Sequence, residues 1–180
     1  MGFRKGNPVG VLCDWQIKVL CEAGMITPFN HTLLNPASLD VLLGDNIYEE
    51  QEKRGLVEKS IAHHTKDDPY LLHPNEFILA QTIETFNVPN RICAQFALKS
   101  SVARAGIEHL LAGWIDPGFN SSVLTLELKN ARRLEPVKLW PGMRIGQIVF
   151  YEMSSHPLES YRTTGRYNGD SKVAPCKGLL

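Results

Sequence analysis

The chain has 180 residues, of which 43% are hydrophobic and 21% are charged, and its 19 basic residues balance 19 acidic ones. This length suits one domain with a hydrophobic core. The zero net charge excludes a general electrostatic attraction to nucleic acid polymers or anionic membranes. An anionic ligand must therefore be bound by a local cluster of cations, and a single small nucleotide fits better than DNA.

The cysteines are scattered along the chain and form no CxxC pair; they are Cys13, Cys21, Cys93 and Cys176. The sequence has no visible signal peptide and no long apolar run. We therefore expect free thiols in a reducing cytoplasm rather than a disulfide framework.

The N-terminal quarter predicts a helix and then a strand. We expect residues 1–10, rich in Gly, Pro and Lys, to become ordered only by docking. Residues 11–24 have helical spacing of apolar positions, with Asp14 suited to the N-cap and a glycine at the end. We interpret Trp15 there as a packing residue. Residues 39–43 predict a strand in which Asp40 either faces solvent or belongs to a site.

The middle of the chain changes from charged to β-prone. Residues 49–68 are charged and weakly periodic, which predicts a mobile insertion or a hairpin tip. His63 and His64 are interpreted as solvated rather than metal-binding, because adjacent residues share no face of a helix or strand. Short apolar or alternating runs then predict strands, which is typical of a β-sandwich or jelly roll; the runs are 70–74, 77–86, 92–98, 137–140 and 145–151.

Residues 99–106 (KSSVARAG) combine two hydroxyls with Lys99 and Arg104. Hydroxyls donate neutral hydrogen bonds, Arg grips phosphate with a planar fork, and Lys adds a point charge, so the set suits an anion. A brief helix over 102–111 would aim backbone amides at the same anion.

Glu127 is the single carboxylate in the apolar, β-prone run 123–128. If it faces inward, burial raises its pKa toward neutrality and makes it a candidate proton carrier. Before it, residues 114–120 (WIDPGFN) predict a tight turn entered by Asp116. After it, residues 152–180 lose apolar periodicity, which fits either disorder or a lid that closes over a nucleotide.

Several motifs, in order along the chain, resemble the dCTP deaminase branch of the dCTP deaminase/dUTPase family. They are 35–44 (NPASLDVLLG), 99–106 (KSSVARAG), 115–118 (IDPG), 124–127 (LTLE), 141–147 (PGMRIGQ), Tyr161 and 165–169 (GRYNG). The resemblance implies a mainly β fold of the dUTPase-like type, a distorted jelly roll or β-barrel with an N-terminal helix and few short helices. It implies one domain over residues 1–180, with 49–68 a charged insertion and 152–180 a C-terminal tail or lid.

The resemblance also implies an enzyme, a hydrolase that deaminates dCTP to dUTP and ammonia and so supplies dUTP to pyrimidine deoxynucleotide metabolism. It gives Glu127 the proton shuttle, Ser100 the attacking water, and Arg104 a place with them in the catalytic group. The implied nucleotide contacts are Lys99, Ser100, Ser101, Arg104, Ala112 through its backbone near the base, Asp116, Tyr161, Arg166 and Asp170.

The implied assembly is a homotrimer whose sites lie between subunits, with dUTP as a further ligand and dTTP as a feedback ligand. Mg²⁺ would ride on the triphosphate, not in a protein cage, so no metal ligand is assigned to the protein. Zinc-dependent nucleobase deaminases need H-x-E and P-C-x-x-C motifs. The chain has neither, because residues 175–178 read PCKG, so deamination would proceed without zinc.

Two alternatives stay open. One is a bifunctional deaminase and diphosphatase that forms dUMP and pyrophosphate, in which Asp116 orients a water; otherwise Asp116 caps its turn. The other is a nucleotide-binding relative with altered catalysis. Trp114 stands where dUTP-forming members commonly have Arg, which weakens the dUTP-forming assignment, and the spacing around Asp116 differs from the family pattern. Trp114, Asp170 in place of a Gln near the phosphates, and the charged insertion 49–68 motivate the relative with altered catalysis.

Overall fold

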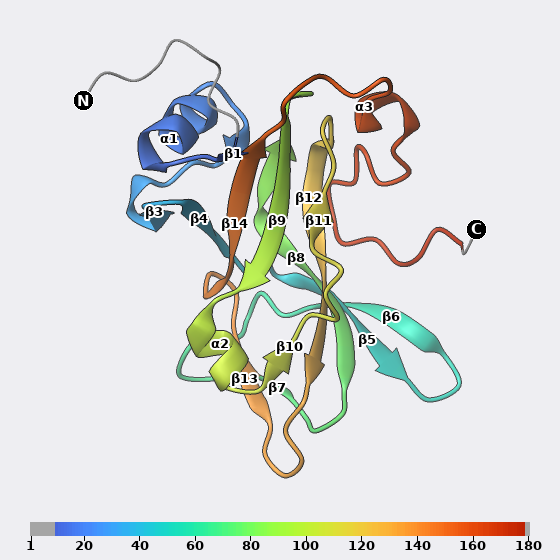
Figure 1. Cartoon of the computed structure of the whole chain (residues 1–180). Helices are drawn as coiled ribbons and strands as arrows, with labels where there is room; N and C mark the ends of the chain where they lie inside the picture. Colours follow the sequence, from blue (N-terminus) through green and yellow to red (C-terminus); the bar gives the residue numbers. More distant parts are fainter. Residues whose placement is uncertain (1–9, 179–180) are drawn as a thin grey trace.

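The computed structural model describes residues 10–178, in which antiparallel strands form two six-stranded sheets and a two-stranded ribbon (Figure 1). The first sheet has the order β11-β9-β14-β4-β3, with β1 paired to β14. The second has the order β10-β12-β8-β5-β6, with β2 paired to β8, and β13 pairs with β7 in the ribbon. The prediction of a mainly β fold with few short helices is confirmed.

Where the sequence predicted β runs, the strand bounds match them closely, whereas the two-residue strands β1, β2, β3, β10 and β11 were not predicted. In the first sheet they are β1 Gly10–Val11, β3 Leu34–Asn35, β4 Ser38–Leu42, β9 Ile92–Leu98, β11 Trp114–Ile115 and β14 Arg144–Glu152. In the second they are β2 Ile26–Thr27, β5 Asn46–Gln51, β6 Gly55–Ser60, β8 Phe77–Asn87, β10 Ile107–Glu108 and β12 Asn120–Asn130. The ribbon consists of β7 Tyr70–Leu72 and β13 Val137–Leu139.

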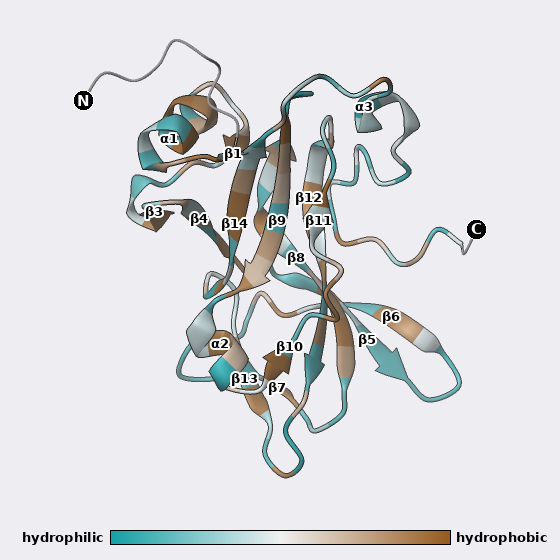
Figure 2. Ribbon diagram, in the orientation of Figure 1, coloured by the Kyte–Doolittle hydropathy of each residue, from teal (hydrophilic) through white to brown (hydrophobic). Residues whose placement is uncertain are grey.

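The core lies between the two sheets, because alternate residues of each strand face inward. Figure 2 shows hydrophobic segments on β9 and β14, where Phe96, Ile148 and Phe150 are buried. Gly146 in β14 makes this packing possible, since a Cβ at that position would overlap the Phe96 ring. The glycine of the 141–147 motif thus has a packing role.

The N-terminal helix α1, Asp14–Glu22, is confirmed, but it begins one residue earlier than predicted. Cys13 is the N-cap, and its backbone N–H donates to Gln16 Oε1 at 3.1 Å. The interpretation of Trp15 as a packing residue is wrong, because it is 58% exposed. The docking expected of residues 1–10 lies outside the described residues apart from Gly10, which pairs with Glu152.

Residues 49–68 contain a hairpin, as one of the two alternatives predicted. Strands β5 and β6 pair from Asn46 opposite Ser60 to Gln51 opposite Gly55, and the chain turns at the charged tip. The rings of His63 and His64 lie 4.1 Å apart, and His64 Nδ1 is 3.1 Å from the carbonyl oxygen of Asp68. The charged residues 52–54 therefore form the exposed turn of a hairpin at the edge of the second sheet.

A helix was predicted over 102–111, but the observed helix α2 spans Ser100–Arg104, so it is shorter and starts earlier. Gly106 ends it with a φ of +104°, a left-handed conformation that favours glycine. The following β10 pairs with β12, where Ile107 lies opposite Asn130. Two further short helices are η1 His31–Leu33 and α3 Tyr161–Thr164. No helix within residues 10–178 has the length and apolar character needed to cross a membrane.

Candidate functional site

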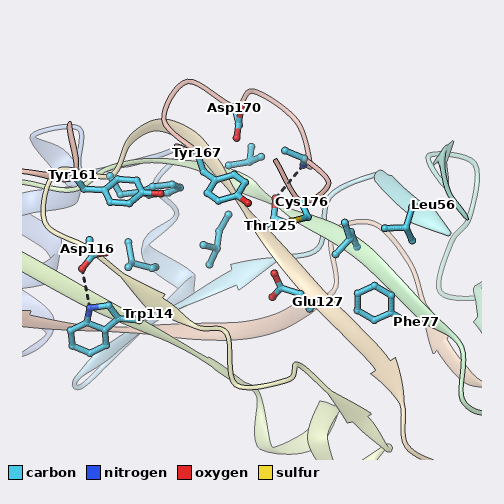
Figure 3. A pocket seen from close by; sticks show the side chains of 16 residues that line it. Leu56, Phe77, Trp114, Asp116, Thr125, Glu127, Tyr161, Tyr167, Asp170 and Cys176 are labelled. Carbon is cyan, nitrogen blue, oxygen red and sulfur yellow. Dashed lines mark hydrogen bonds between the residues drawn. The ribbon is translucent and has the colours of Figure 1, made fainter. Parts of the chain in front are cut away.

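A cavity of about 490 Å³ opens between β12, the central turn and the C-terminal tail (Figure 3). Its lining combines apolar and aromatic side chains with three carboxylates. The residues are Leu56, Phe77, Leu79, Trp114, Ile115, Asp116, Phe119, Val123, Leu124, Thr125, Glu127, Tyr161, Tyr167, Asp170, Ala174 and Cys176. A concave, mostly apolar site with a few convergent polar groups is the usual form of a small-molecule site.

Glu127 faces this cavity because of its place on β12. Leu126 and Leu128 are buried in the core, so the side chain between them points the other way, into the cavity (Figure 3). In the pairing of β12 with β8, Glu127 lies opposite Leu79. Burial raises the pKa of Glu127 above the ordinary value of 4.5. This carboxyl group can therefore exchange a proton at a pH closer to neutrality than an ordinary glutamate.

The central turn places Asp116 at the same cavity. Ile115 is buried and anchors β11, and the Phe119 N–H closes the turn on the Asp116 carbonyl oxygen at 3.1 Å. Trp114 Nε1 donates to Asp116 Oδ1 at 3.2 Å. Within residues 10–178 this is the carboxylate's only hydrogen bond, so the side chain does not cap the turn through a backbone amide.

The C-terminal tail forms one wall of the cavity. Its helix α3 rests on the central turn, where the Tyr161 N–H donates to the Pro117 carbonyl oxygen at 3.0 Å. The tail then runs beside β12: the Val123 N–H donates to the Asp170 carbonyl oxygen at 2.9 Å, and the Ala174 N–H donates to Thr125 Oγ1 at 3.3 Å. These contacts place the aromatic rings of the tail over the cavity.

The charge of Asp170 is offset inside the tail. Lys177 Nζ lies 2.7 Å and 2.8 Å from its two carboxylate oxygens, so a lysine of the tail neutralises this carboxylate. The Arg166 guanidinium instead donates to the carbonyl oxygens of Lys177 and Gly178 at 2.6 Å and 2.9 Å. Sequence reasoning missed Lys177 because no periodic pattern links it to Asp170.

A second, basic cavity of about 790 Å³ adjoins α2. Ser101 and Arg104 line it, together with Arg132, Lys138 and Arg144. The predicted site residues therefore divide between two places in the chain: Asp116, Glu127, Tyr161 and Asp170 line the first cavity, and Ser101 and Arg104 line the second. In the described part of the chain Lys99, Ser100, Ala112 and Arg166 line neither of the two.

Lys99 is bound to a buried carboxylate. Its Nζ lies 2.8 Å and 3.0 Å from the oxygens of Asp40, whose side chain is fully buried. Asn35 Nδ2 donates to the same carboxylate at 2.7 Å, and Arg144 Nη1 lies 3.4 Å from it. The solvent-facing alternative for Asp40 is wrong, and this ion pair joins the motif at 35–44 to the motif at 99–106. A nucleotide contact by Lys99 stays a prediction.

Glu84 is a buried acid that sequence reasoning missed. It lies on β8 with 2% exposure, and its carboxylate accepts the Leu42 N–H at 3.1 Å and 3.3 Å. Burial raises the pKa of Glu84 to about 7. The signal was present, because Glu84 is the single charged residue of β8, much as Glu127 is the single carboxylate of the run 123–128. Among the described residues, no three His, Cys, Asp or Glu side chains are grouped as metal ligands.

Comparisons with known proteins agree on one family. The dCTP deaminase-like family profile matches residues 11–153. A protein of Acidothermus cellulolyticus named "dCTP deaminase, dUMP-forming" is 37% identical, covering 93% of this chain and 94% of its own. One of the same name from Mycobacterium marinum is 36% identical, covering 93% and 95%.

A solved structure supports the fold. The crystal structure of 2′-deoxycytidine 5′-triphosphate deaminase from Agrobacterium tumefaciens superposes with a TM-score of 0.62 at 21% identity. The alignment covers 80% of this chain and 48% of that one. With the family profile spanning most of the sequence and these relatives above 30% identity, the chain belongs to the dCTP deaminase-like family.

Proposed function

We propose that this protein deaminates dCTP and cleaves the product to dUMP and pyrophosphate. The observation that carries the proposal is the pairing of Glu127, an acid with a raised pKa, and Asp116, a second carboxylate, in one cavity. Two carboxylates in different environments suit two different steps. The relatives named "dUMP-forming" favour this alternative over release of dUTP.

In the first step the oxygen of a water adds to C4 of cytosine. Glu127 takes one proton of that water and returns it to the amino nitrogen, the C4–N bond breaks, and ammonia leaves. The second proton ends on N3 of uracil. A general acid and base of this kind contributes about 10²- to 10⁴-fold to the rate, and the partly apolar surroundings of Glu127 support the role.

In the second step a water attacks the α-phosphorus of dUTP. Asp116 accepts the proton of that water, and the bond from the α-phosphorus to the bridging oxygen breaks. The electron pair of that bond leaves with pyrophosphate, and Asp116 later loses its proton to solvent. The products are dUMP, pyrophosphate and one proton.

The nucleotide site is proposed to be shared between subunits of a homotrimer. Ser101 and Arg104 line a cavity separate from that of Glu127, which suits a motif that completes a neighbour's site. In this arrangement Ser100 holds the water and Arg104 approaches the nucleotide, while Tyr161 and the tail cover it. Mg²⁺ enters as part of the substrate on the triphosphate oxygens.

The test is product analysis with the magnesium complex of dCTP. Wild-type protein is expected to form dUMP, pyrophosphate and ammonia in equal amounts, separated by chromatography. The variant Glu127→Gln should lose at least about 10²-fold in turnover. Its matched control is Glu108→Gln, an exposed glutamate on the neighbouring strand β10. The variant Asp116→Asn should accumulate dUTP.

Three other outcomes would each change the proposed function in a different way. Release of dUTP alone by the wild type would replace the bifunctional assignment with a dUTP-forming deaminase. Tight dCTP binding in calorimetry without turnover would indicate a relative with altered catalysis. Full activity of Glu127→Gln would remove the proposed shuttle.

A further inference from the structure

Trp114 donates a hydrogen bond to Asp116, and contacts with the first sheet hold its indole ring in place. It lies on β11 opposite Gln95 of β9, and its ring stacks on Tyr151 with centroids 6.1 Å apart and an interplanar angle of 28°. The Tyr151 hydroxyl donates to Gln95 Oε1 at 3.3 Å. The indole is thus held on the outer face of the first sheet, with its Nε1 donating to Asp116 Oδ1 at 3.2 Å.

This geometry leaves one oxygen of Asp116 available. An indole has a single donor and no acceptor, so it fixes Oδ1 and leaves Oδ2 able to accept a proton from water. Asp116 itself is exposed at the mouth of the cavity that holds Glu127. Without a donor beside it, the carboxylate of an exposed aspartate is free to sample several rotamers.

We propose that Trp114 is a positioning residue which orients Asp116 for the second step and thereby decides whether dUMP or dUTP leaves the protein. This inference rests on the proposed function. Trp114 holds the Asp116 carboxylate so that Oδ2 meets the water that attacks the α-phosphorus. Losing the hydrogen bond slows this attack, and dUTP then dissociates before it is cleaved.

The experiment compares Trp114→Phe with wild type. Phe keeps an aromatic ring that can stack on Tyr151 but removes the N–H donor. Two rates are measured for each protein: loss of dCTP, and cleavage of added dUTP. For each protein we take the ratio of the dUTP cleavage rate to the dCTP loss rate. This ratio is expected to be about tenfold or more lower in Trp114→Phe than in wild type, which is the usual effect of losing a hydrogen bond to a charged group. Free dUTP should appear among the products of dCTP.

Two further variants make the result specific. Trp15→Phe is the matched control, because Trp15 has similar exposure, 58% against 59%, and does not line the cavity; it should keep the wild-type product ratio. In the Asp116→Asn background, Trp114→Phe should cause no further loss of dUTP cleavage, because the two residues act through one interaction.

The outcomes separate this inference from the proposed function. If wild type and Trp114→Phe form dUMP in the same ratio to dUTP, the positioning role is refuted while the function stands. If Trp114→Phe slows both steps equally, the residue is merely structural and the inference is again refuted. If wild type releases only dUTP, both the dUMP-forming function and this inference fail.

Discussion

Replacing Glu84 by Gln should remove a pH-dependent cost to stability. Glu84 is 2% exposed and accepts the Leu42 N–H, which joins β8 to β4. Burial raises its pKa in the folded state to about 7, while the unfolded chain keeps a value near 4.5. Between these values the folded state binds more protons than the unfolded state. The stability due to this group therefore falls as pH rises from about 4.5 to about 7, and is then constant.

The size of the effect follows from the two pKa values. At about 1.4 kcal/mol for each pH unit, the difference between 4.5 and about 7 corresponds to about 3 kcal/mol. Gln keeps an oxygen that can accept the Leu42 N–H but carries no charge. We therefore expect Glu84→Gln to gain about 3 kcal/mol relative to wild type between pH 5 and pH 8.

The assay is urea unfolding of both proteins from pH 5 to pH 8.5, at one protein concentration. The difference between the two curves isolates Glu84 from groups common to both proteins, such as Glu127. As a control, Glu58→Gln changes an exposed glutamate of β6 that pairs with Lys172 at 3.6 Å, and it should change the free energy of unfolding by less than about 0.5 kcal/mol. A difference between Glu84→Gln and wild type that stays the same across the pH range would refute the reasoning.

Two further substitutions test the packing of polar groups. Lys99→Met removes the main cation from buried Asp40 and should cost about 3 kcal/mol, whereas Lys18→Met, which breaks an exposed pair at 3.9 Å, should cost less than about 0.5 kcal/mol; equal midpoints in thermal unfolding would contradict this. Asn130→Ala removes a fully buried side chain that makes three hydrogen bonds to backbone groups, and should cost about 3 kcal/mol. The control Asn46→Ala removes one bond to a neighbouring side chain, and urea unfolding should separate the two by at least about 1 kcal/mol.

The sequence predicted the strands well because their signal is local. Alternating apolar residues between turn residues determined β8, β9, β12 and β14 to within a few residues. The same alternation directs Glu127 away from the core and into the cavity, where burial raises its pKa, which is the condition that we set from the sequence for a proton carrier. Helix limits were predicted less well. The helix α2 ends early because a left-handed glycine and the pairing of β10 with β12 interrupt it, and such pairing depends on residues distant in the chain.

Polar partners could not be predicted, because they are chosen by tertiary contacts. The alternating strand left open whether Asp40 faces solvent or belongs to a site, and the fold decides by bringing Lys99 and Arg144 against its carboxylate. Trp15 fitted a helical apolar stripe, but no element of the described chain covers its ring, which is 58% exposed.

The sequence by itself determined the family, the β architecture and the candidate acid Glu127, since ordered motifs and side-chain alternation are properties of the chain. Only the tertiary structure decided that Glu127 shares a cavity with Asp116 while Ser101 and Arg104 line another. The physical reason is that strand pairing and tail docking set distances between residues far apart in sequence, and no local pattern encodes those distances.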